Sequence, residues 1–136
     1  MTAGKAPKTS IHVGIVVGDD AVRDSLQTLL QSHGLTVTSF TSGQEFLSSP
    51  LRKSVSCLLV DQQMPGMTGL ELVEKLRSKA DRTPAILMNA SAGEALSQRI
   101  KRANIAALLI KPVEQGELLA WIDHIRTLPR WRGENK

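Results

Sequence analysis

The sequence predicts an α/β protein with a doubly wound, five-stranded parallel sheet and five helices. Two observations carry this prediction. Apolar runs of strand length alternate five times with segments of helical periodicity, and in each unit the strand comes first. The 136 residues also suffice for one domain with its own core. The single cysteine, Cys57, lies in an apolar run and excludes an internal disulfide framework and any CxxC site.

Five segments have the composition of strands. The predicted strands are Ile11–Val17, Thr36–Phe40, Ser56–Asp61, Pro84–Asn89 and Ala106–Ile110. The last three are almost continuously apolar, which is typical of parallel strands that are buried on both faces.

The helix starts are indicated by capping boxes, in which Ser or Thr precedes Glu by three residues. The three boxes are Ser42/Glu45, Thr68/Glu71 and Ser91/Glu94. The first helix is expected from Asp20, as its N-cap, to His33, and Gly34 follows in the position where helices commonly end on glycine.

Charge and hydropathy narrow the possible classes of function. The chain holds 17 Lys+Arg and 13 Asp+Glu, a net charge of +4, and much of the excess lies near its two ends. The cluster of Arg99, Lys101 and Arg102 is interpreted as a solvated face, because few aromatic side chains accompany it, and no nucleic-acid binding is expected. No apolar stretch of about 18 residues and no signal peptide occurs, which favours a cytoplasmic protein without a membrane segment.

The chain is expected to hold one folded unit. The boundaries are a disordered leader over 1–10, the domain over 11–127 and a basic tail over 128–136, with no output domain.

The chemistry is expected at the carboxyl ends of the strands, where open parallel sheets bind ligands. Asp61 ends the third predicted strand and Lys111 follows the fifth. A carboxylate can act as a nucleophile toward a phosphoryl group, and a lysine can neutralise the phosphoryl oxygens. The sequence therefore predicts an anion-handling pair at this edge.

The run CLLVDQQMPGMTGLEL, the strand end LLIKP and the five βα units resemble the receiver domain of two-component response regulators over about residues 11 to 127. The resemblance implies a flavodoxin-like sheet of order 2-1-3-4-5, Asp61 as phosphoacceptor and Lys111 as the contact to the phosphate. It also implies a cis peptide bond between Lys111 and Pro112. Such domains are signalling domains rather than enzymes.

This chain departs from the family at the metal site. Receivers carry two adjacent acidic residues there, and by their offset from Val22-Arg23 these places fall on Val17 and Gly18. Asp61, the main-chain carbonyl of Gln63 and, after a slip of one or two residues, Asp19 remain as candidate ligands. Compared with the family it resembles, this chain is therefore expected to have a magnesium site that is weak or absent.

Two further departures concern the switch positions. The family has Thr or Ser at the end of the fourth strand, where this chain has Asn89, and an aromatic residue at the place of Leu108. An amide can still donate a hydrogen bond to a phosphoryl group, but with different geometry. Leu108 has no ring that could swing between exposed and buried positions.

Other functional classes agree less well with the sequence. A haloacid-dehalogenase-type phosphatase needs a second Asp where Gln63 lies, and no Gly-rich phosphate loop follows the first strand. The three histidines, His12, His33 and His124, lack the spacing of metal ligands and are assigned structural roles.

The sequence thus predicts a single-domain response regulator with atypical or weakened metal dependence. The resemblance implies a histidine kinase or phosphotransfer protein as partner, and a possible homodimer through the face of the fourth helix, fifth strand and fifth helix. Trp121 is a candidate for that face, and Trp131 lies in the basic tail. The alternative is a phosphorylation-independent interaction module on the same fold.

Overall fold

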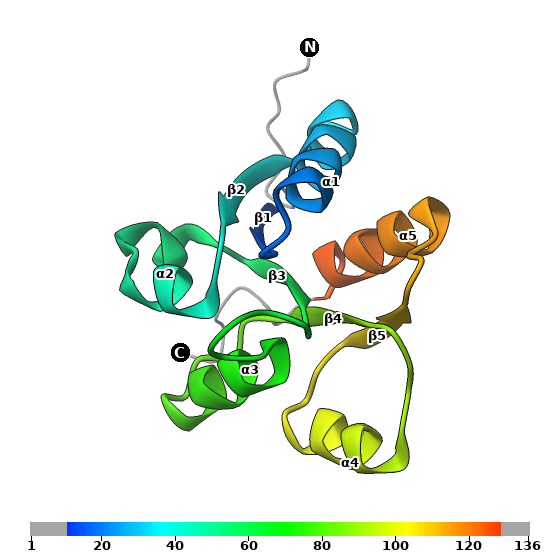
Figure 1. Ribbon diagram of the computed structural model, residues 1–136. Coiled ribbons are helices and arrows are strands. Elements are labelled where there is room, and N and C mark those ends of the chain that lie inside the picture. The colour runs from blue at the N-terminus through cyan, green and yellow to red at the C-terminus, as the bar shows by residue number, and fades with distance from the viewer. Residues whose placement is uncertain (1–10, 129–136) are drawn as a thin grey trace.

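The computed structural model describes residues 11–128 and shows a five-stranded parallel sheet of order β2-β1-β3-β4-β5 (Figure 1). This confirms the predicted fold class and strand order. The strands are β1 (His12–Val16), β2 (Thr36–Phe40), β3 (Cys57–Asp61), β4 (Ala85–Asn89) and β5 (Ala107–Ile110). Each lies within the segment predicted for it. The predicted leader over 1–10, and the tail beyond residue 128 with Trp131, lie outside the described residues.

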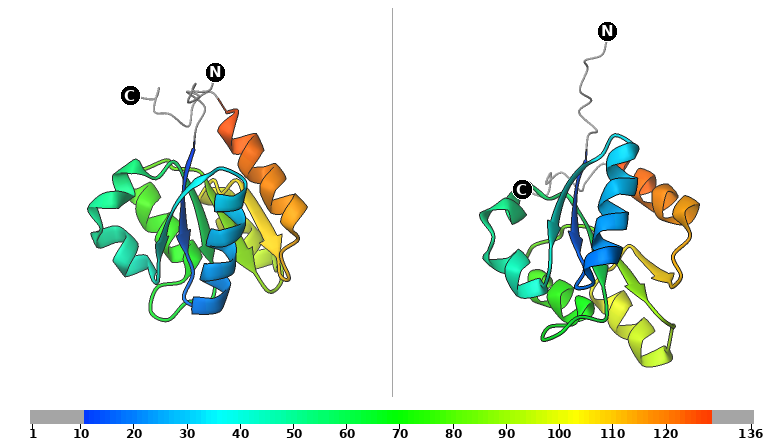
Figure 2. Two further views of the ribbon diagram at one scale, coloured as in Figure 1. Left: turned by 90° about the horizontal axis from the view of Figure 1, so that it is seen from above. Right: turned by 45° about the horizontal axis from the view of Figure 1, so that its top comes forward.

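Helices cover both faces of the sheet, so every strand residue of β3 and β4 is buried (Figure 2). The helices are α1 (Asp20–Ser32), α2 (Gly43–Ser48), α3 (Gly69–Ser78), α4 (Glu94–Arg102) and α5 (Gln115–Arg126). A 3₁₀ turn at Pro50–Ser54, which was not predicted, follows α2. One core cluster joins the sheet to α1 and α5, and the other joins it to α2, α3 and α4. No helix among residues 11–128 is long and apolar enough to span a membrane.

The helix starts confirm part of the capping predictions. Thr68 and Glu71 form a complete capping box at α3. At α2 the Ser42 side chain accepts a hydrogen bond from the Glu45 N–H, but the Glu45 carboxylate binds Thr41 instead of closing the box on Ser42.

Two predicted caps are wrong. The N-cap of α1 is Asp19, whose Oδ1 accepts a hydrogen bond from the Val22 N–H, so Asp20 is the first helical residue. The predicted Ser91/Glu94 box does not form, because α4 begins at Glu94 after an N-cap at Gly93 that makes no side-chain hydrogen bond. Glu94 is therefore in the first position of the helix, two residues short of the place from which a box closes.

Candidate functional site

Asp61 is the last residue of β3 and lies at the carboxyl edge of the sheet, with its side chain 7% exposed. The chain leaves this strand through a tight approach to α3. A Cβ on Gly69 would lie 2.5 Å from the Asp61 carbonyl oxygen, so only glycine lets the start of α3 pack here. The Gln62 side chain accepts a hydrogen bond from the Leu70 N–H at 2.8 Å and fixes the same helix start. The close approach of Gly69 and the bond from Leu70 to Gln62 thus fix the main chain at Asp61 against the start of α3.

The carboxylate of Asp61 is held at one oxygen. Its Oδ1 accepts hydrogen bonds from Lys111 Nζ at 2.8 Å and from the Gln63 N–H at 3.1 Å. Neither of these donors, nor any other described residue, binds Oδ2. One carboxylate oxygen is therefore oriented and neutralised while the other is left without a donor.

Lys111 reaches Asp61 because β5 ends beside β4. The Lys111 N–H donates a hydrogen bond to the Asn89 carbonyl at 2.8 Å, which continues the strand pairing by one residue. The following Lys111-Pro112 peptide bond is cis, as the resemblance implied. The structure therefore brings Asp61, Asn89 and Lys111 together, as the rule for strand ends predicted.

Among residues 11–128, Asn89 and Asp61 are the two buried polar side chains. Asn89 is 8% exposed, and its side chain has hydrogen-bond partners on two sides. Its Nδ2 donates to the Ser91 carbonyl at 2.6 Å, and its Oδ1 accepts from Gln63 Nε2 at 3.4 Å. The residue in the Thr/Ser position of the family is thus already hydrogen-bonded to the loop that precedes α4.

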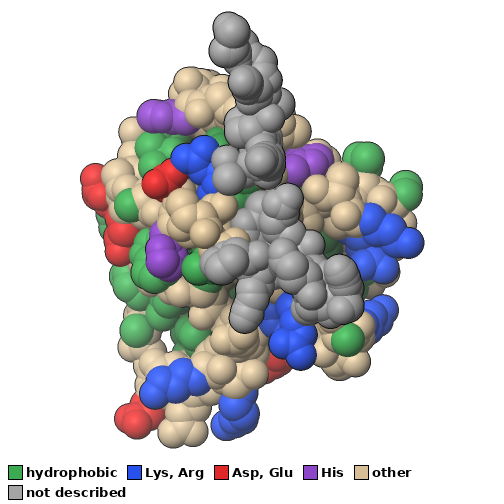
Figure 3. Space-filling model, turned by 180° about the vertical axis from the view of Figure 1, so that it is seen from behind, with side chains coloured by type: hydrophobic (Ala, Val, Ile, Leu, Met, Phe, Trp, Pro, Cys, Tyr) green, Lys and Arg blue, Asp and Glu red, His purple; other side chains and the backbone are tan. Residues whose placement is uncertain are grey.

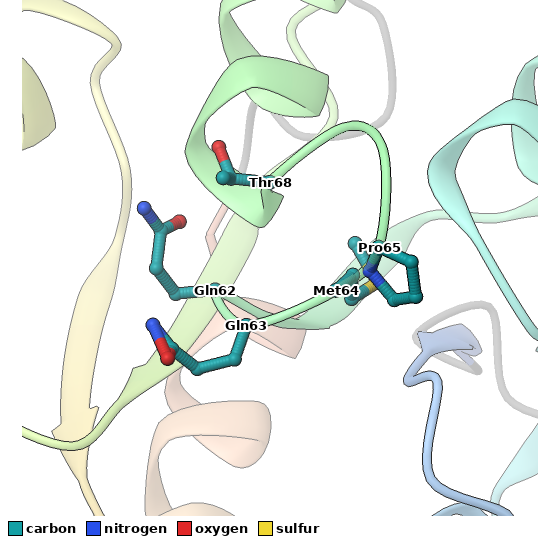
Figure 4. A pocket seen from close by; sticks show the side chains of 5 residues that line it. All are labelled: Gln62, Gln63, Met64, Pro65 and Thr68. Atoms are coloured by element: carbon teal, nitrogen blue, oxygen red, sulfur yellow. The ribbon is translucent and has the colours of Figure 1, made fainter.

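The loop after Asp61 carries a shallow pocket lined by Gln62, Gln63, Met64, Pro65 and Thr68 (Figure 4). The two glutamine side chains extend to the same side of the loop, whereas Met64 and Pro65 lie on the other side. Primary amides, and not carboxylates, are therefore the polar groups nearest in sequence to Asp61.

The end of β1 lacks the acidic pair of the family. The Val17 side chain is fully buried in the core, and Gly18 has no side chain. Asp19 is exposed, and the carboxylate oxygen that it uses as a helix cap points to α1. Arg23 Nη1 donates to the carbonyl oxygens of Val17 and Gly18, at 2.8 and 3.3 Å, and so closes this turn.

The donor set does not fit a carboxylate-rich magnesium site. Within residues 11–128, no group of three or more Asp, Glu, His or Cys side chains is placed to hold a metal ion. Mg²⁺ is usually bound by one or two carboxylates with phosphate oxygens and waters. Asp61 is the one acid that the structure places at this strand end, and Asp19 as a ligand stays a prediction.

The remaining candidate residues lie away from Asp61. Leu108 is a partly buried residue of β5 that packs against the core cluster under α2, α3 and α4. Trp121 is partly buried on α5 and packs edge-on against His124, with ring centroids 5.6 Å apart. Burial raises the pKa of the Cys57 thiol to about 12, so this cysteine is an unreactive core residue.

Residues 13–123 match the family described as the response regulator receiver domain. The chain belongs to this family. Among curated proteins, the receiver is 34% identical over 111 residues to the transcriptional regulatory protein FixJ of Azorhizobium caulinodans, covering 82% of this chain and 53% of that protein. It is 31% identical to the response regulator protein TodT of Pseudomonas putida, covering 79% of this chain and 48% of that protein. The chain thus spans about half the length of these relatives.

Solved structures of receivers have the same fold. The response regulator StyR superposes with a TM-score of 0.80 at 33% identity, covering 89% of this chain and 61% of that chain. The structure described as FixJ-N gives a TM-score of 0.76 at 25% identity, covering 86% of this chain and 94% of that chain. The receiver fold and a place in two-component signalling are therefore shown for this chain.

Several contacts of the site could not be predicted from the sequence. Gly69 and the capping role of Gln62 depend on how closely α3 approaches β3, which no local pattern reveals. The hydrogen bond from Asn89 Nδ2 to the Ser91 carbonyl has a local signal. Asn side chains commonly bind a main-chain group two residues further along the chain.

Proposed function

We propose that this receiver accepts a phosphoryl group on Asp61 from a histidine kinase or a phosphotransfer protein. The observation that supports it is the asymmetry of the Asp61 carboxylate: Lys111 and the Gln63 N–H hold Oδ1, and no described residue donates to Oδ2. A carboxylate held at one oxygen presents the other to an incoming electrophile. Receiver domains act with histidine kinases or phosphotransfer proteins, which supplies the chemical class of the donor.

The transfer would proceed by attack of Asp61 Oδ2 on the phosphorus atom of a phosphohistidine. The new O–P bond forms an acyl phosphate while the N–P bond breaks, and its electron pair returns to the imidazole of the donor, which then takes up a proton. Catalysis of such a transfer rests on positioning and on neutralising charge. Lys111 Nζ, 2.8 Å from Oδ1, is the cation that this chain places there.

Receiver domains generally use Mg²⁺ for this reaction, and we propose an atypical, weakened dependence on it here. The family's acidic pair is replaced by Val17 and Gly18, and Asp61 with the Gln63 main-chain carbonyl would be the remaining ligands. Gly18 nevertheless has room for a side chain, because a Cβ there would meet Pro65 Cδ at 3.6 Å and the Thr41 carbonyl oxygen at 3.8 Å, both ordinary contacts. Gly18→Asp is thus a way to restore an acid at this edge.

The proposal is tested by the mass of the intact protein after incubation with acetyl phosphate or a phosphorylated kinase. The wild-type chain should gain one phosphoryl group, and Asp61→Asn should gain none. Asp24→Asn is the matched control, since Asp24 is an exposed acid on α1. Persistence of labelling in Asp61→Asn would place the phosphoacceptor elsewhere.

A second candidate function is a phosphorylation-independent interaction module. The replacement of the acidic pair, together with Leu108 at the aromatic switch position, favours it. The partner-binding or dimerising surface would be the face of α4, β5 and α5, where Ile110 is 42% exposed. Seen from behind, hydrophobic side chains reach the surface on the side where these elements lie (Figure 3). No labelling by either donor, with binding to a partner retained in Asp61→Asn, would favour this function.

A further inference from the structure

The loop between β4 and α4 is held to the rest of the domain by one side chain. Residues 90 to 92 are exposed and belong to no helix or strand. Within the described part of the chain, the one hydrogen bond to this segment is the bond from Asn89 Nδ2 to the Ser91 carbonyl oxygen, at 2.6 Å. The next element, α4, begins without a side-chain cap. The position of the loop therefore depends on Asn89.

Asn89 is itself held at the Asp61 site. The Gln63 N–H binds the Asp61 carboxylate, and the Gln63 side chain donates to Asn89 Oδ1. The Asn89 side chain is buried, so its rotamer is restricted by packing as well as by these bonds. A continuous path of hydrogen bonds thus joins Asp61 through Gln63 and Asn89 to Ser91.

The number of hydrogens on the Asn89 amide decides how the loop responds to a phosphoryl group. A hydroxyl has one hydrogen, so a Thr or Ser in this position must choose between the phosphoryl group and another acceptor. The Nδ2 group has two hydrogens. One binds the Ser91 carbonyl, and the other has no acceptor among residues 11–128. Asn89 can therefore donate to a phosphoryl oxygen without releasing Ser91.

We propose that Asn89 is a positioning residue that holds the β4–α4 loop in one arrangement whether or not Asp61 carries a phosphoryl group. This inference rests on the proposed function for its second half, because it concerns the regulation of the same site. If Asn89 holds the loop in this way, the loop before α4 does not change conformation when Asp61 is phosphorylated. Any conformational response to phosphorylation then involves another part of the domain.

The test uses the backbone order parameters and amide chemical shifts of residues 90–93, measured by NMR in the full chain. In the wild type we expect order parameters of about 0.85, as in rigid backbone, and in Asn89→Ala values below about 0.6. Ser91→Ala is the matched control, because it keeps the main-chain carbonyl that Asn89 binds, and its loop should stay rigid. Unchanged amide shifts over β1 and β2, which do not pair with β4, show that each variant is folded.

The same spectra are then recorded after phosphorylation by acetyl phosphate, with the extent of labelling given by intact mass. The loop shifts of the wild type should stay the same, whereas those of Asn89→Thr should change when its single hydroxyl hydrogen turns to the phosphoryl group. A rigid loop in Asn89→Ala, or a wild-type loop that changes on labelling, would overturn the proposal. If the wild type gains no phosphoryl group, the proposed function is wrong, and the comparison of Asn89→Ala with the wild type alone decides the role of Asn89.

Discussion

Two cationic side chains, Lys111 and Arg77, bind oxygen atoms at opposite edges of the sheet. They differ in whether the group that they bind keeps an oxygen without a hydrogen-bond donor. At the carboxyl edge, Lys111 contacts one oxygen of Asp61, and the other oxygen has no donor among the described residues. At the opposite edge, Arg77 of α3 donates to four main-chain carbonyl oxygens, those of Asp81, Thr83, Ala103 and Asn104, at 2.7 to 3.4 Å. Burial lowers the pKa of the Arg77 guanidinium, which remains a cation.

The comparison separates a structural group from a reactive one. Arg77 joins the segments that lead into β4 and β5, and four of its five N–H groups donate to main-chain oxygens. Asp61 is equally well positioned but keeps an oxygen available. Substitutions at the Arg77 edge should therefore lower stability without changing phosphoryl transfer. Substitutions at the Asp61 edge should mainly slow phosphoryl transfer, with a smaller loss of stability.

The largest loss of stability is expected for Arg77→Met. The variant keeps an aliphatic side chain but leaves four carbonyl groups without their donor, and we expect the free energy of unfolding to fall by about 3 kcal/mol. Urea denaturation measures this. The control Arg82→Met, at an exposed position, should stay within about 0.5 kcal/mol of the wild type. A slower phosphoryl transfer per folded molecule in Arg77→Met would break the comparison.

At the other edge, Lys111→Met should slow labelling of Asp61 by about 100-fold, the size of effect seen when one donor to developing negative charge is removed. The expected change in stability is smaller, about 1 kcal/mol, since Lys111 is partly exposed and the carboxylate can take up water. Labelling quenched at a series of times gives the rate of phosphoryl transfer, and urea denaturation of the same variant gives its free energy of unfolding. A labelling rate equal to that of the wild type would show that Lys111 serves only as a structural ion pair.

A gain in stability is expected at the end of α3. Ala80 has a φ of 65°, in the left-handed region that costs a residue with a Cβ about 1 kcal/mol. Ala80→Gly should therefore raise the free energy of unfolding by up to about 1 kcal/mol. Asn104→Gly is the comparison, because Asn104 has a φ of 56° but asparagine tolerates this region better, so its gain should be smaller. Equal gains at both positions would contradict this explanation.

The smallest expected effect is a dependence of stability on pH through His12. His12 lies on β1, its Nε2 is 2.7 Å from Thr38 Oγ1, and burial lowers its pKa below the usual 6.5. Because the unfolded chain then binds a proton more readily than the folded one, this contribution is fully present above about pH 6.5 and is lost as the pH falls toward the lowered pKa. His12→Gln should flatten the pH dependence of unfolding in this range. An unchanged slope would assign it to other groups.

The sequence predicted the fold and the central pair of the site for a physical reason. Hydrophobic periodicity is a local signal, and in a parallel sheet it also places Asp61 and Lys111 at one edge. It could not predict contacts that depend on packing. The Arg77 bonds join α3 to the end of α4, 26 residues away, and the clearance at Gly69 depends on a main-chain oxygen of β3. The predicted N-cap of α4, Ser91, lies two residues before the observed N-cap, Gly93. Ser91 instead accepts a hydrogen bond from the Asn89 side chain at its main-chain carbonyl, a contact that the capping pattern does not indicate.

The central claim is that Asp61 accepts a phosphoryl group at a site where Lys111 neutralises the phosphoryl charge without a metal ion held by an acidic pair. The most direct test is the initial rate of labelling by acetyl phosphate, with magnesium and with EDTA, in the wild type and in Gly18→Asp. We expect the wild type to be labelled at rates that differ little between the two conditions. Magnesium should accelerate Gly18→Asp at least about tenfold, or about 1.4 kcal/mol of transition-state stabilisation. Wild-type labelling that requires magnesium, or no labelling at all, would contradict the claim.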